Sequence, residues 1–253
     1  MTIRPGFFSA NISGKQLGAP ATTTANSSSS YTFVPSASTT TFGSITVTKK
    51  TTSPNGSWTE PTLSNNEMVF GGSQGIAYLD NDQLHVVPPY SVQVDFYTTQ
   101  VAKSTAYIWN NGQGNGIGWP EAVVALNGSS LNMYTSSNSL GGTTYQARFA
   151  IKSNIQVNTW YRLGIMWYNT GGNNYVRFYL NGSALYTHQY SGTAFYPDPF
   201  NQTGGQNTST SDGLPYNSSN GIAIGSDNAN DPTTRWEGKI RNVFVGKTLF
   251  WSI

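Results

Sequence analysis

Most glycoside hydrolases use a pair of carboxylates, so the acidic residues of this chain are the first candidates for catalysis. A retaining enzyme holds its two carboxyl groups about 5 Å apart. The chain has only four glutamates, and none has a second carboxylate at a suitable spacing on a predicted strand. These four are Glu60, Glu67, Glu121 and Glu237, and Asp95 also stands alone in its segment. The sequence argues against a hydrolase, and we expect a protein that is not an enzyme.

One alternative enzyme is a polysaccharide lyase, in which a base removes a proton next to a carboxylate. Arg177, His188, Gln189 and Tyr190 lie on two predicted strands joined by the turn Asn181-Gly182. A histidine beside a tyrosine can remove such a proton. The same residues are also what the solvent-facing side of two strands would carry, and we favour that interpretation.

Two segments rich in Asp and Asn are candidate calcium sites. Asp80 and Asp82 lie in the first segment, and Asp227 and Asp231 lie in the second. Ca²⁺ takes about six to eight oxygen ligands, so both segments would have to meet at one rim of the fold. Asp and Asn also favour turns, which is the commoner explanation. Calcium is the one cofactor that the sequence suggests.

Two aromatic loops are candidate carbohydrate-binding sites. The segment 109–119 is a glycine-rich run with Trp109 and Trp119 at its ends. The segment 192–221 is long for a loop in a compact domain, and long ordered loops tend to be functional. Its aromatic residues include Tyr196, Phe200 and Tyr216. Aromatic rings with nearby amides bind sugars, but the same rings are equally favoured at subunit contacts.

Composition and charge exclude several other classes of protein. The net charge is +2 with no basic stripe, which argues against a nucleic-acid partner. There is no cysteine, so disulfide frameworks and thiolate metal sites are excluded. No apolar run reaches the roughly 18 residues that span a bilayer, and we expect no membrane insertion. The first residues lack the apolar stretch of a secretory signal, which predicts synthesis in a cytoplasm.

Strand signals follow one another from residue 66 to the end of the chain. In 91–97 apolar Val92, Val94 and Phe96 alternate with polar residues, which predicts a strand with one buried face. The segments 160–167 and 175–180 show the same alternation.

Turn signals separate these predicted strands. Asn127-Gly128 and Asn181-Gly182 each lie between two apolar runs, which is the strongest local signal for a β-hairpin. In 238–245 the apolar positions fall out of step by one residue, which predicts a β-bulge near Arg241–Asn242. The chain is therefore expected to be all-β, a sandwich of two packed antiparallel sheets.

The first 65 residues have a different character. Residues 22–30 are a low-complexity run of Ser, Thr and Asn, and two short alternating runs follow it. Neither run has enough apolar area to form a core alone. We expect residues 1–65 to be an extended Ser/Thr-rich arm that carries one or two strands. The arm would pack on the main domain, residues 66–253, or on another subunit.

Four segments, in this order, resemble the concanavalin A-like lectin/glucanase superfamily in its laminin-G-like and pentraxin-like branch. They are 78–85 with 88–96, then 158–165, then 176–182 with its Asn-Gly turn, and finally 222–225 with 236–240. Together they cover about residues 66–250. The resemblance implies a jelly-roll sandwich, and its branch often binds calcium through rim loops. The matching residues are structural, so they imply a fold rather than an activity.

The interpretation that best combines these features is a virion structural protein, most readily a bacteriophage appendage, fibre or capsid decoration. Its partners would be other virion proteins, reached through the arm, and glycans on the host surface. We expect a homo-oligomer located in the virion. The alternative is an extracellular lectin on the surface of a bacterium. In either case the rim loops, rather than the strands, are expected to carry recognition.

Overall fold

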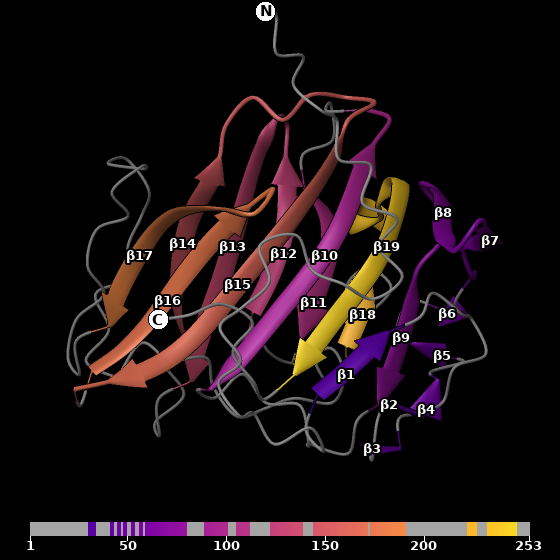
Figure 1. The fold of residues 1–253 in the computed structure, drawn as a ribbon. Coiled ribbons are helices and arrows are strands. Elements are labelled where there is room, and N and C mark those ends of the chain that lie inside the picture. Colours follow the sequence, from indigo (N-terminus) through magenta and orange to yellow (C-terminus); the bar gives the residue numbers. More distant parts are fainter. Residues whose placement is uncertain are drawn as a thin grey trace, which may run out of the picture.

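The computed structural model is a sandwich of two antiparallel β-sheets, which confirms the fold class predicted from the sequence (Figure 1). It describes residues 30–33, 41–42, 45–46, 48–49, 52–53, 56–57, 59–79, 89–100, 105–111, 122–138, 144–171, 173–190, 222–226 and 232–246. Figure 1 views the molecule from the side of the larger sheet, with the smaller sheet behind it.

The larger sheet has eight strands in its described part. In spatial order they are β17 (Ser183–Tyr190), β16 (Asn173–Leu180), β15 (Trp160–Thr170), β10 (Tyr90–Thr98), β19 (Glu237–Gly246), β8 (Glu67–Gly71) and β7 (Thr62–Ser64), with β1 (Ser30–Phe33) also paired to β19.

The smaller sheet has seven strands in its described part. Their order is β14 (Thr144–Lys152), β13 (Ser130–Asn138), β12 (Ala122–Asn127), β11 (Ala106–Asn111), β18 (Ile222–Ile224), β9 (Ile76–Leu79) and β4 (Thr48–Lys49). Two short pairs accompany the sheets, β2 (Thr41–Phe42) with β3 (Ile45–Thr46) and β5 (Thr52–Ser53) with β6 (Gly56–Ser57), and a 3-10 turn, η2, covers Pro232–Thr234.

Tight turns set the register of neighbouring strands. Asn181 and Gly182 have φ angles of 51° and 82°, so both adopt the left-handed conformation that a two-residue type I′ turn needs between β16 and β17. The Asn181 side chain accepts a 2.8 Å hydrogen bond from the backbone N–H of Arg162, which ties this turn to β15. Asn65 and Asn66, with φ angles of 52° and 61°, join β7 to β8 in the same way.

A single apolar core fills the space between the sheets. The predicted inward residues of β10, Val92, Val94 and Phe96, are all fully buried in it. Every second residue of β15 and β16 also contributes, which confirms the alternation predicted for both strands. Each large apolar side chain buried in this way contributes about 2 kcal/mol to folding.

A β-bulge interrupts β19, where the sequence predicted it. Gln93 pairs with Phe244 and Asp95 pairs with Arg241, so β19 has one more residue than β10 in this interval. Asn242 has a φ of 50° at the bulge. The bulge returns Val243 and Val245 to the core side while Arg241 stays on the outer side.

Strands from the predicted arm join both sheets. β1 pairs with β19 from Gly246 to Val243, β4 pairs with β9, and β7 forms a hairpin with β8. The boundary expected at residue 66 therefore falls within a hairpin turn. No helix in the described part of the chain is long and apolar enough to cross a membrane.

Candidate binding surface on the eight-stranded sheet

The outer face of the eight-stranded sheet carries an ordered group of charged and aromatic side chains. Their strand neighbours Val94, Phe96 and Ile240 point into the core, so these residues point away from it. Because β15, β10, β19 and β8 are adjacent, residues far apart in sequence meet here. We call the group the outer-face cluster; it consists of Glu67, Asp95, Tyr97, Trp160, Arg162, Lys239 and Arg241.

A buried ion pair lies at the centre of the outer-face cluster. Arg162 donates from Nε to Asp95 Oδ1 at 2.6 Å and from Nη2 to Asp95 Oδ2 at 2.7 Å. The side chains are only 8% and 6% exposed. Asn242, at the bulge, donates a further 2.8 Å bond to Asp95 Oδ2. This two-pronged geometry fixes both side chains more firmly than a single contact would.

Arg241 connects this pair to the surface. Its Nη1 donates to Glu67 Oε1 at 2.9 Å, and its Nε lies 3.6 Å from Asp95 Oδ2. The guanidinium group lies over the Trp160 ring, 3.9 Å from its centroid. Lys239 forms a second ion pair with Glu67, at 3.0 Å. Arg241 is therefore held by carboxylates on two strands and by an aromatic ring on a third.

Trp160 and Tyr97 provide the aromatic part of the outer-face cluster. Their ring centroids lie 5.5 Å apart with the planes tilted by 47°, and both side chains are partly exposed. The Tyr97 hydroxyl donates to Asn158 Oδ1 at 3.0 Å, and Lys239 Nζ lies 5.7 Å from the Tyr97 ring centroid. The surface thus combines fixed aromatic rings with hydrogen-bond donors, a combination that suits a saccharide.

The structure corrects the prediction for Trp109. Trp109 is a candidate carbohydrate-binding residue at one end of the glycine-rich segment, but its side chain is 0% exposed and belongs to the core. The reason is a register shift between Tyr107 and Trp109, which turns both Ile108 and Trp109 inward. A buried ring of this kind has no face to offer a sugar. The other predicted carbohydrate-binding residues, Trp119, Tyr196, Phe200 and Tyr216, lie outside the described residues.

The predicted calcium residues Asp80, Asp82, Asp227 and Asp231 also lie outside the described residues. Within the part of the chain that the structure describes, no group of three or more His, Asp and Glu side chains is placed to hold a metal ion. In the outer-face cluster, Glu67 and Asp95 are engaged by arginine and lysine instead.

The register divides the residues considered for lyase chemistry between two faces. Arg177 pairs with Thr187, and its Nε donates to Thr187 Oγ1 at 2.8 Å. His188 pairs with Val176, a core residue, so its position belongs to the opposite face of the sheet. Tyr190 follows His188 at the next position of that face, whereas Gln189 shares the face of Arg177. The register thus places the backbone positions of Arg177 and Gln189 on one face of the sheet and those of His188 and Tyr190 on the other.

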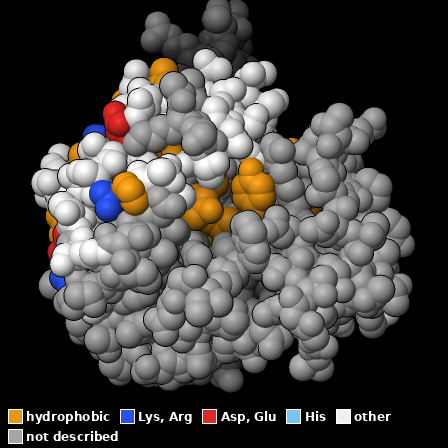
Figure 2. All heavy atoms as spheres, turned by 180° about the vertical axis from the view of Figure 1, so that it is seen from behind, with side chains coloured by type: hydrophobic (Ala, Val, Ile, Leu, Met, Phe, Trp, Pro, Cys, Tyr) orange, Lys and Arg blue, Asp and Glu red, His pale blue; other side chains and the backbone are white. Residues whose placement is uncertain are grey.

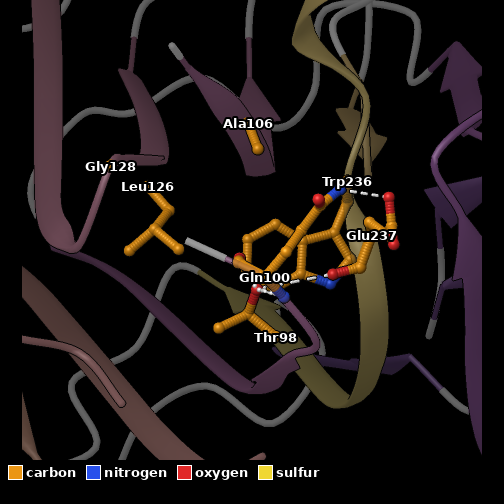
Figure 3. A pocket seen from close by; sticks show the side chains of 7 residues that line it. All are labelled: Thr98, Gln100, Ala106, Leu126, Gly128, Trp236 and Glu237. Atoms are coloured by element: carbon orange, nitrogen blue, oxygen red, sulfur yellow. Dashed lines mark hydrogen bonds between the residues drawn. The ribbon is translucent and has the colours of Figure 1, made fainter. Parts of the chain in front are cut away.

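A pocket lies at one end of the sandwich (Figure 3). It is too small to hold a sugar ring. It has space for about one water molecule. Its lining consists of Thr98, Gln100, Ala106, Leu126, Gly128, Trp236 and Glu237. Two of these residues are bonded to each other, since the Gln100 amide donates to the Glu237 carboxylate. Figure 2 shows the molecule from the side of the seven-stranded sheet, and the described residues on that side present only a few charged side chains.

The sequence reasoning did not find the outer-face cluster. The signal available was Asp95 and Arg162, each a charged residue inside an otherwise apolar alternating strand. Alternation alone places both residues on an outer face. Only the pairing of β10 with β15 shows that they lie opposite each other.

Comparisons with known proteins identify the fold. No family model and no curated protein matches the sequence. The structure is similar to two mutants of HCR/D, with TM-scores of 0.52 and 0.51 at 11% and 13% identity, over 87% of this chain and 48% of each of those chains. It is also similar to the botulinum neurotoxin serotype D ligand-binding domain in complex with N-acetylneuraminic acid, with a TM-score of 0.47 at 11% identity, over 81% of this chain and 44% of that chain.

This chain therefore spans about half the length of the solved structures that it matches. At such low identity the similarity establishes the fold alone. That fold is a two-sheet antiparallel jelly roll of the concanavalin A-like type, as expected from the sequence.

Proposed function

We propose that the chain is a glycan-binding protein without enzymatic activity, and that the outer-face cluster is where the saccharide lies. The observation that carries the proposal is the partly exposed pair Trp160 and Tyr97, flanked by the cations Lys239 and Arg241. The apolar face of a sugar ring packs on aromatic rings, while nearby donors bind its hydroxyl groups.

The rigidity of the outer-face cluster supports this proposal. Asp95 and Arg162 are buried and bonded at two points, and Arg241 is fixed by contacts from three directions. A surface whose side chains are already ordered loses little conformational entropy when a ligand binds. Binding constellations carried by strands are also more precisely placed than those on loops.

The direct test is a glycan array followed by calorimetric titration of the saccharide that binds best. Replacing Trp160 by leucine (Trp160→Leu) removes the ring, and we expect affinity to fall at least tenfold, by roughly 1.4 kcal/mol or more. The matched control is Tyr107→Leu, because Tyr107 is a partly exposed aromatic residue of β11 in the other sheet.

The control variant is expected to bind like the wild type. Thermal unfolding of both variants, followed by circular dichroism, verifies that they are folded. A blank array for the wild type, or unchanged affinity in Trp160→Leu, contradicts the proposal.

The absence of enzymatic activity is part of the same proposal. What supports it is the engagement of both cluster carboxylates by cations and the division of the lyase candidates between two faces. Incubation with uronate polymers tests it, because a lyase product contains a double bond that absorbs ultraviolet light. An absorbance increase that depends on Tyr190 would restore the lyase interpretation.

For the biological setting, we propose a virion appendage, with a bacterial surface lectin as the alternative. The features that support a virion protein are the lack of cysteine, which suits assembly in a reducing cytoplasm, and the Ser/Thr-rich arm. The neighbouring genes discriminate between the two settings. Capsid and tail genes beside this one favour the virion, and secretion genes favour the bacterial lectin.

A further inference from the structure

The charges of the outer-face cluster do not balance. Three cations, Arg162, Lys239 and Arg241, face two carboxylates, Asp95 and Glu67. Asp95 is committed to Arg162 by two hydrogen bonds. Glu67 is shared between Lys239 at 3.0 Å and Arg241 at 2.9 Å. One positive charge of the cluster is thus left without a counter-charge inside it.

Hydrogen-bond donors also outnumber acceptors in the cluster. Two nitrogen atoms of the cluster, Arg162 Nη1 and Arg241 Nε, are buried and have no hydrogen-bond acceptor. The nearest ion-pair contact of Arg241 Nε, 3.6 Å to Asp95, is too long for a hydrogen bond. A buried donor without a partner costs free energy. These two atoms are buried and do not touch a ligand themselves, but their unpaired N–H groups add to the positive potential beneath Lys239 and Arg241, which favours a negatively charged group at the surface.

The surplus charge reaches the surface beside the aromatic rings. The side chains of Lys239 and Arg241 are 40% and 36% exposed, whereas Glu67 is only 12% exposed. Lys239 Nζ lies over the Tyr97 ring and the Arg241 guanidinium lies over the Trp160 ring. The Arg241 guanidinium covers one face of the Trp160 ring, so a sugar ring would pack on the remaining exposed surface of Tyr97 and Trp160, next to an anionic group bound by the two cations.

We propose that the outer-face cluster selects saccharides that carry an oxyanion substituent, a carboxylate or a sulfate ester. This inference rests on the proposed glycan-binding function and specifies its ligand class. Lys239 and Arg241 contact the oxyanion. Asp95, Arg162 and Asn242 act as positioning residues, because they hold Arg241 and the strand beneath it without reaching the ligand.

The experiment compares three forms of one oligosaccharide, neutral, carboxylated and sulfated, by calorimetric titration into the intact chain. We expect the anionic forms to bind about tenfold more tightly than the neutral form at low salt. The advantage should shrink as salt rises to about 0.15 M and beyond, because ions screen exposed charges. The carboxylated and sulfated arms show which oxyanion is preferred.

Two variants test the assignment to residues. Lys239→Met and Arg241→Gln remove one positive charge each, and we expect each to reduce the preference for the anionic form to about threefold or less. The matched control is Lys152→Met, since Lys152 is an exposed lysine of β14 in the other sheet. The control should retain the full preference.

The outcomes separate the two proposals. If no form binds, the glycan-binding function is wrong and this inference with it. If all three forms bind equally, or if Lys152→Met lowers the preference as much as Lys239→Met, the function survives and the oxyanion inference is wrong. A preference lost only in Lys239→Met and Arg241→Gln supports the inference.

Discussion

At the scale of single residues, the buried Asp95–Arg162 pair is the feature on which the candidate surface depends. Taking two charges out of water is costly, and the pair offsets that cost only while both members are present. Removing one member leaves the other as an uncompensated charge near the core. The partly exposed pair Lys49–Glu60 offers a natural comparison, since water screens its charges.

We therefore expect that removing one member of the pair lowers stability much more than breaking the partly exposed Lys49–Glu60 pair does. We expect Arg162→Met to lower the free energy of unfolding by about 3 kcal/mol, measured by urea denaturation. The double variant Asp95→Leu with Arg162→Met should lose less than the sum of the two single losses. The control Glu60→Gln should cost under about 1 kcal/mol. Additive losses in the double variant would show that the two residues do not act as a pair.

Tyr78 predicts a specific sensitivity to alkaline pH. Burial raises the pKa of its hydroxyl, and the negative charge of Glu60 raises it further. A tyrosine in the unfolded chain ionises near pH ~10. Above that pH the unfolded state releases this proton while the folded state retains it, so stability falls as pH rises. Below about pH 10 the Tyr78 hydroxyl is protonated in both the folded and the unfolded state, so it does not make stability depend on pH there.

The measurement is urea denaturation of the wild type and of Tyr78→Phe at a series of pH values from neutral to alkaline. Phenylalanine has no proton to lose, so the variant should lose less stability than the wild type over the alkaline range. Equal slopes for the two proteins would mean that Tyr78 does not control this pH dependence.

At the scale of elements, the close approach of β19 to the end of β10 depends on Gly238. This glycine has a φ of 140°, and a Cβ placed on it would lie 2.0 Å from the carbonyl oxygen of Tyr97. We expect Gly238→Ala to lower the free energy of unfolding by about 3 kcal/mol or more, because the backbone must move. It should also weaken glycan binding, since Tyr97 and Lys239 flank this site.

Gly71 supplies the control for this substitution. It is in β8, paired with Glu237, and a Cβ there meets nothing closer than the flexible side chain of Gln74 at 3.5 Å. Gly71→Ala should change stability by no more than about 0.5 kcal/mol, measured by the same denaturation. Equal effects at both positions would contradict the close approach.

Elements that depend on local sequence could be predicted, and those that depend on distant pairing could not. Asn181-Gly182 specifies its turn through two residues that tolerate positive φ. The bulge near Asn242 was visible because the apolar period slips by one. The shift that buries Trp109 leaves no such mark, because Tyr107, Ile108 and Trp109 are all large and partly apolar.

At the scale of the whole molecule, one continuous core joins the two sheets, and the candidate surface is built on the outer side of one of them. The jelly-roll fold was predicted from its order of segments. The position of the candidate site was not, because it requires the neighbour relations of β15, β10, β19 and β8, which come from three distant parts of the chain. The sequence instead pointed to aromatic loops.

A saccharide bound to the outer-face cluster and one bound to the aromatic loops would contact different residues, and this difference can be measured. Nuclear magnetic resonance of the isotope-labelled intact chain, titrated with the saccharide that binds best, maps the contact residue by residue. We predict that the largest shifts fall on the Trp160 indole and on the amides of Tyr97, Lys239 and Arg241. Shifts confined to residues 109–119 and 192–221, with the strands of the outer-face cluster unaffected, would contradict binding at this cluster.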